Sequence, residues 1–148
     1  MATYSSTTFT SQPAIYPRNA GETITVFAQY ALTAALALND VIRMLTVPAG
    51  CIIADAVLVA DDLDTGGAPA ITLDVGIAGA DTDQLFAAST VAQAGGVVRP
   101  TIATAFRDAA TTADRTVQVL VKAGPATGAT TGKIGLSVSY RAKQVNGL

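Results

Sequence analysis

The chain has 148 residues, a formal net charge of −2 and a charged content of 14%, against about 25% in a typical domain. This length fits a single domain, and no apolar run reaches the roughly 18 residues of a membrane span. Lys and Arg are scattered singly, which disfavours nucleic acid as a partner. A surface this poor in charge is typical of a protein that buries part of its outside against other subunits, so we expect a homo-oligomer. The alternative is a monomer with a surface rich in Ala and Thr.

Residues 1–21 form the first predicted region. They are rich in Ser and Thr, contain two prolines and show no helical periodicity. Because they offer too little apolar area to fold alone, we interpret them as an extended N-terminal arm. The opening residues lack the basic and apolar regions of a secretory signal, so we expect synthesis in a cytoplasm. The domain itself is predicted over residues 22–141, and residues 142–148 form a short polar tail.

Alternation of apolar and polar residues begins at Glu22 and predicts a series of strands. In the first strand, the apolar residues that share one face are Ile24, Val26, Ala28, Tyr30 and Leu32. Further strands are predicted at 41–47, 51–60, 71–77, 97–105, 116–122 and 133–141. Residues 84–91 are expected to form a short helical turn, and Pro100 indicates that the strand at 97–105 lies at a sheet edge.

The last two predicted strands are separated by the Gly- and Thr-rich segment 123–132. We interpret them as a hairpin with an exposed, mobile tip. About seven or eight short strands with turn signals between them are typical of an all-β fold. The predicted fold is therefore an antiparallel β-sandwich or jelly roll.

The sequence lacks the residues on which most catalysis depends. It contains no histidine and a single cysteine, which excludes Ser-His-Asp and Cys-His arrangements, an internal disulfide and a paired-cysteine zinc site. Cys51 begins an apolar run and has no basic neighbour in the sequence, so it is predicted to be a small buried residue. A two-carboxylate glycosidase would need an aromatic cleft, and the chain has no Trp. We expect no enzyme activity, no cofactor and no small-molecule substrate.

One acidic cluster is a candidate calcium site. Asp61, Asp62 and Asp64 lie in a glycine-containing loop, and Asp74 follows in the next strand. Loop carboxylates can hold Ca²⁺, but this spacing is not that of an EF-hand. The favoured interpretation is a turn in which Asp side chains accept hydrogen bonds from nearby backbone N–H groups.

The arm carries the candidate partner-binding residues. Tyr4, Phe9 and Tyr16 are spaced along it, and Arg18 lies close to the last of them. Aromatic side chains and Arg are frequent anchors in protein interfaces. We favour contact with a partner, and the alternative is that the aromatic residues fold back onto the domain's own sheet.

The central part of the chain resembles a known family. Residues 40–58 read DVIRMLTVPAGCIIADAVL, and the motifs DDLDTG at 61–66 and ITLDVG at 71–76 follow. This succession resembles the capsid decoration, or cement, proteins of tailed bacteriophages. In that family a strand ends in a Pro-x-Gly turn, and an apolar strand, an Asp-rich loop and a Leu-Asp-x-Gly strand follow. The similar motifs lie within residues 40–79. The general character of the sequence is similar over about residues 22–140.

The resemblance implies a jelly-roll subunit of the virion, commonly a homotrimer, on the exterior of an icosahedral capsid. Its partners would be the major capsid protein and further copies of itself, and it would stabilise the shell by clamping neighbouring capsomers. The host bacterial cytoplasm would be its place of synthesis. Two other hypotheses are a receptor- or carbohydrate-binding module of a head fibre or tail tip, which would use the 123–132 loop, and a shell-forming coat protein. The chain is short for a coat protein and lacks a long helix.

Overall fold

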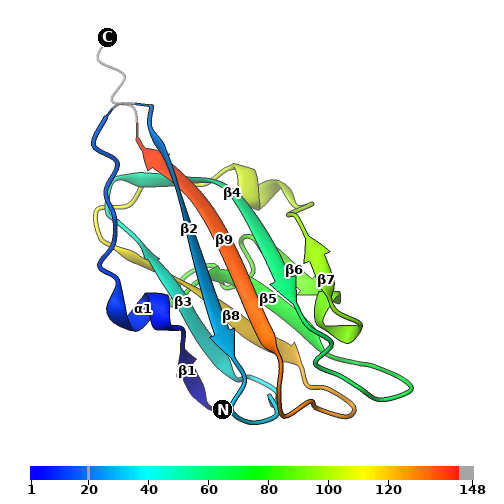
Figure 1. The fold of residues 1–148 in the computed structure, drawn as a ribbon. Coiled ribbons are helices and arrows are strands. Elements are labelled where there is room, and N and C mark those ends of the chain that lie inside the picture. The colour runs from blue at the N-terminus through cyan, green and yellow to red at the C-terminus, as the bar shows by residue number, and fades with distance from the viewer. Residues whose placement is uncertain (20, 144–148) are drawn as a thin grey trace.

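The computed structural model describes residues 1–19 and 21–143, so most of the predicted tail, residues 144–148, lies outside the described residues. Within them the chain forms two β-sheets with a few short helices (Figure 1). In chain order the elements are β1 (Thr3–Ser5), α1 (Thr7–Ser11), β2 (Thr23–Ala31), β3 (Val41–Val47), β4 (Cys51–Ala60), β5 (Thr72–Ile77), β6 (Phe86–Ser89), η1 (Val91–Gln93), β7 (Gly96–Val98), η2 (Ala103–Phe106), β8 (Arg115–Ala123) and β9 (Lys133–Ala142). No helix among the described residues has the length and apolar character needed to cross a membrane.

The two sheets have the strand orders β1-β3-β8-β5-β6 and β2-β9-β4-β7. The strands pair in a nested pattern, β2 with β9, β3 with β8, β4 with β7 and β5 with β6, and all four pairs are antiparallel. A long hairpin wound into two layers gives this pattern, which is that of a jelly roll. The predicted all-β sandwich is confirmed.

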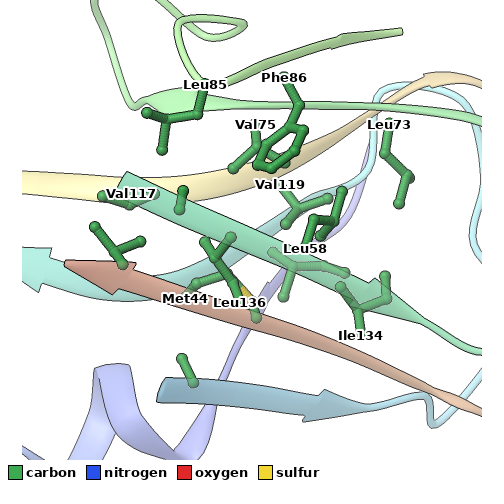
Figure 2. Packing of buried hydrophobic residues seen from close by; sticks show 14 of the residues in the cluster. Met44, Leu58, Leu73, Val75, Leu85, Phe86, Val117, Val119, Ile134 and Leu136 are labelled. Atoms are coloured by element: carbon green, nitrogen blue, oxygen red, sulfur yellow. The ribbon is translucent and has the colours of Figure 1, made fainter. Parts of the chain in front are cut away.

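The sequence alternation places one face of each sheet in the core. In β2, Ala28 and Tyr30 are buried, whereas Phe27 and Gln29 are exposed. Side chains from the two sheets meet between the layers, as Figure 2 shows for Leu58 and Leu136 on one side and Val75 and Val119 on the other. Burial of this apolar area is the main stabilising contribution to the fold.

The turn between β3 and β4 is the one that the sequence predicts. Gly50 has a φ of +76°, a left-handed conformation that glycine adopts without strain. The Cys51 N–H donates to the Pro48 carbonyl at 3.3 Å. This tight turn carries the chain from one sheet to the other, because β3 and β4 lie in different layers.

Several local predictions are wrong. The strand predicted at 97–105 ends at Val98, and Ala103–Phe106 form the short helix η2. β8 and β9 do not form a hairpin, because each is a central strand of a different sheet and the segment between them crosses between the layers. That segment is anchored: the Ala129 N–H donates to the Leu63 carbonyl at 3.1 Å. Within residues 84–91, Phe86–Ser89 form strand β6 in place of a helical turn, because pairing with β5 carries Phe86 into the core.

The N-terminal segment packs along one side of the sandwich (Figure 1, dark blue). β1 adds to the edge of β3 as a parallel strand, and the short helix α1 departs from the fully extended conformation that we expected. Ser6 explains the helix, since its buried hydroxyl accepts a hydrogen bond from the Phe9 N–H at 3.0 Å and donates to the Met44 carbonyl. The segment therefore forms part of the folded domain.

Candidate functional site

The acidic cluster forms a structural connection between two loops. Asp64 is 1% exposed, and its carboxylate accepts backbone N–H groups of Ala70, Ile71, Ala126 and Thr127 at 2.6–3.1 Å. Burial acts to raise the pKa of this carboxyl, but the four N–H donors outweigh it and hold the pKa well below its usual range. The carboxylate thus joins the loop after β4 to the segment between β8 and β9.

The structure does not gather the four candidate calcium ligands. Asp61 accepts the Lys133 N–H at 2.9 Å, Asp62 accepts the Asp64 N–H at 3.1 Å and Asp74 accepts the Ala88 N–H at 2.7 Å. Across residues 1–19 and 21–143, no group of three or more His, Cys, Asp and Glu side chains is placed to hold a metal ion.

A second buried polar cluster lies at the start of β8. Arg115 Nη1 and the Asp108 carboxylate are 2.6 Å apart, and Arg115 Nη2 donates to the Cys51 carbonyl at 2.8 Å. Burial acts to raise the pKa of Asp108, but hydrogen bonds from Arg115, the Ile53 N–H and Gln84 together lower it. The cluster ties the beginnings of β4 and β8 to the loop before β6, which is a structural role.

Cys51 is fully buried, as predicted. Its basic neighbour, Arg115, is distant in sequence and was therefore missed. Burial raises the pKa of the thiol, and this effect outweighs the opposing effect of Arg115. Because thiolate is the reactive form, this cysteine is poorly suited to be a nucleophile.

The structure divides the four candidate partner-binding residues of the arm. The Tyr4 ring packs 5.4 Å from the Tyr30 ring, and the Phe9 ring lies 5.8 Å from the Arg43 guanidinium carbon. Both aromatic residues thus fold back onto the domain. Tyr16 is 53% exposed and Arg18 is exposed, so these two remain available to a partner, and their role remains a prediction.

A surface that the sequence analysis missed lies on the outer side of the β2-β9-β4-β7 sheet. We call it the Phe27 face, and its apolar members are Phe27, Val57, Val59, Gly135 and Val97. Phe27 is 52% exposed and Val97 is 68% exposed. The strand register places Gly135 beside Val59 and Val59 beside Val97. In the same register the partner of Gly135 on β2 is the exposed Gln29, and Ser137 lies between Phe27 and Val57. The apolar row therefore runs from Val97 through Val59 to Gly135, and the Phe27 ring extends it by lying over Gly135.

Glycine at position 135 allows the Phe27 ring to lie down on the sheet. A Cβ atom placed there would approach two ring atoms to 3.0 Å, a spacing that would push the ring outward. The ring therefore covers the sheet surface, and its free side faces outward beside Val59. The outward positions of β4 gave a signal in the sequence, since the part of this strand that follows Asp55 reads AVLVA and is apolar on both faces.

Charges are confined to the margin of the Phe27 face. Asp55 and Arg99 form an ion pair with each other at one side, and Lys133 and Arg141 occupy the two ends of β9. Thr25 and Ser139 contribute a pair of hydroxyls 2.7 Å apart. In contrast, the strands of the other sheet carry the exposed Arg43 and Lys122.

A jelly-roll domain with buried structural polar clusters and a broad uncharged face is typical of proteins that act by contact with other proteins. No family model and no curated protein sequence matches the chain, but solved structures do. A chain in the structure "Capsid of Ralstonia phage GP4" is 40% identical with a TM-score of 0.84, and the match covers 97% of this chain and 100% of that one. A chain in "Cyanophage Pam1 capsid asymmetric unit" is 31% identical with a TM-score of 0.71, covering 88% of this chain and 94% of that one.

Identity at this level over nearly whole chains shows common descent as well as a common fold. The chain therefore belongs to a family of bacteriophage capsid proteins. It is a structural protein of the virion.

Proposed function

We propose that this protein is a decoration protein that binds the exterior of an icosahedral phage capsid as a homotrimer. In this role it clamps neighbouring capsomers and stabilises the shell. The observation that carries the proposal is the 40% identity, over the full length of both chains, to a chain in the Ralstonia phage GP4 capsid structure. The major capsid protein is the expected partner, and host bacterial cytoplasm the place of synthesis.

The small size and the absence of a long helix among the described residues favour a role on the shell over one in forming it. A jelly roll with its N-terminal segment packed along its own side is a rigid block, suited to lie across the boundary between capsomers. Many copies on one particle bind by multivalency, so each contact can be modest. Tyr16 and Arg18 are the residues of the arm that we expect to contact the shell.

The alternative role as a receptor- or carbohydrate-binding module depended on a free loop tip at 123–132. The hydrogen bonds from Ala126, Thr127 and Ala129 anchor that loop to the segment after β4. No observation of the structure now favours this second role.

The test uses capsids of the parent phage assembled without this chain. Purified protein is added, the particles are sedimented, and their disruption temperature is measured with and without bound protein. We expect saturable binding and a higher disruption temperature, and a reconstruction of the loaded particles should show the protein outside the shell. Failure to bind, or density within the shell lattice itself, would contradict the proposal.

A paired substitution tests the arm. The double variant Tyr16→Ala, Arg18→Ala should bind these capsids more weakly by about tenfold, on the scale of one interface anchor lost. Leu38→Ala is the matched control, because Leu38 is 54% exposed and lies outside the arm. Equal binding by the double variant and the control would exclude a role of the arm in the contact.

A further inference from the structure

We propose that copies of this chain associate with one another through the Phe27 face. The proposal rests on the capsid role above and identifies the surface that forms the oligomer. In a cyclic oligomer the same face of each copy turns toward the symmetry axis, so the residues near the axis meet their own counterparts.

Charge is the first argument for a second copy as the occupant. A face that meets itself brings like charges together, and like-charge contacts cost several kcal/mol. The Phe27 face keeps this cost low at its centre, because its central residues are uncharged and Asp55 and Arg99 neutralise each other. Lys133 and Arg141 lie at the margin of the face, at the two ends of β9. On the other sheet Lys122 has an ion-pair partner in Asp74 at 3.7 Å, and the exposed Arg43 lies near the Phe9 ring. Arg43 would meet a like charge if this sheet faced its own copy.

The pattern of β4 is the second argument. A strand with one face in water alternates apolar and polar residues, whereas a strand covered on both faces is apolar throughout. β4 places Ala56 and Leu58 inward and Val57 and Val59 outward. Asp55 faces outward earlier in the strand, so the pattern predicts a covering layer over Val57 and Val59.

The size of the face is the third argument. β2, β9, β4 and β7 contribute nine, ten, ten and three residues. At about 3.3 Å by 4.8 Å for each residue, the face is on the order of 500 Å². Two such faces in contact bury on the order of 1,000 Å², which is the lower size for a specific interface. Phe27 provides the aromatic anchor that interface centres commonly contain.

The experiment measures the oligomeric state of the purified full chain by sedimentation equilibrium over a range of concentrations. The wild type should be oligomeric, and Val97→Glu should raise the dissociation constant about 100-fold or more, because it places an unpaired charge in an apolar contact. Val97→Lys should act in the same direction, since an unpaired charge of either sign is costly to bury. Val97 is 68% exposed, so neither change disturbs the core, and circular dichroism and Tm should confirm an intact fold.

Leu38→Glu is the matched control, because Leu38 is a similarly exposed apolar residue outside the Phe27 face. Loss of association in both Val97 variants, with the control still oligomeric, would support the proposal. A monomeric wild type, an unchanged oligomer in the Val97 variants, or an effect of only one sign of charge would overturn it.

Capsid binding separates this inference from the proposed function. Val97 variants that stay oligomeric and still bind capsids would overturn only the inference. Val97 variants that stay oligomeric but lose capsid binding would also overturn the inference. They would show that the Phe27 face contacts the shell. A wild type that associates through the Phe27 face but does not bind capsids would overturn only the decoration role.

Discussion

Single buried polar side chains determine how the loops of this protein are held. Asp64 is the clearest case, because one carboxylate accepts four backbone N–H groups from two segments that are more than 50 residues apart in sequence. Buried N–H groups without an acceptor are costly, so the ionised carboxylate stabilises both segments together. The turn interpretation of this aspartate was favoured from the sequence, but its long-range partners could not be foreseen, because the strand pairing sets them.

Asp64 should make the stability of the protein sensitive to acid. Its folded-state pKa lies below the value of about 3.9 for an unfolded Asp. Its contribution is therefore fully present above pH of about 5 and is lost as the pH falls through the unfolded and then the folded pKa. Asp108, whose pKa is also lowered, acts in the same direction. We expect Tm to fall steeply below about pH 4.

The variant Asp64→Asn should have a lower Tm at neutral pH and a flatter dependence of Tm on pH between about 5 and 2. Thermal unfolding followed by circular dichroism measures both. Asp61→Asn is the matched control, because Asp61 is exposed and accepts a single backbone N–H. An Asp64 variant with the acid response of the wild type would contradict this account.

At the scale of elements, the N-terminal segment shows how a local motif and an edge strand support each other. β2 is a nine-residue edge strand without Pro or Lys, and such an edge invites pairing with other chains unless it is covered. α1 lies beside it, and the Thr8 hydroxyl donates to the Phe27 carbonyl at 3.2 Å. The Tyr140 hydroxyl also donates to the Ile15 carbonyl at 2.6 Å. The segment therefore covers this edge of the sandwich.

Ser6 should contribute more to the stability of the fold than an exposed residue of the same Ser- and Thr-rich segment. The variant Ser6→Ala removes the N-cap of α1 and leaves the Met44 carbonyl without its donor. We expect the free energy of unfolding to fall by about 1–3 kcal/mol, measured by urea denaturation. Thr7→Ala, at an exposed position, should change it by less than about 0.5 kcal/mol. Equal effects of the two changes would show that the Ser6 hydroxyl has no special role.

The strands that the sequence predicted well are those with strong alternation or with a clear turn after them, such as β2, β3 and β4. β6 escaped prediction, because it is short and rich in small residues, so only its pairing with β5 defines it. The assignment of β8 and β9 to separate sheets was also beyond the sequence, since adjacent alternating strands suggest a hairpin. The Phe27 face depends on that register, and only the apolar outward positions of β4 hinted at it.

At the scale of the whole molecule, the two sheets present outer surfaces of different character. One carries a continuous apolar row with charge at its margin, and the strands of the other carry exposed cationic side chains. This asymmetry suits a subunit that meets its own copies on one side and a different protein on another. The two kinds of contact should therefore differ in how strongly they depend on salt.

Association through the Phe27 face should depend little on salt, because it removes apolar area from water and pairs few charges. We expect the dissociation constant of the oligomer to change by less than about threefold between roughly 0.05 M and 0.5 M NaCl. Sedimentation equilibrium at the two concentrations measures this change. A rise in the dissociation constant of more than about tenfold with salt would indicate an interface held by ion pairs.

The nested strand order also determines when the protein can fold. β8 lies between β3 and β5, and β9 lies between β2 and β4, so the last two strands are the centres of the two sheets. A nascent chain that has reached only residue 130 contains β8 but lacks β9, so β2 and β4 have no strand between them. Such a chain exposes its apolar faces to chaperones and proteases. The ladder of the β2-β9-β4-β7 sheet therefore cannot form until β9 has been synthesised.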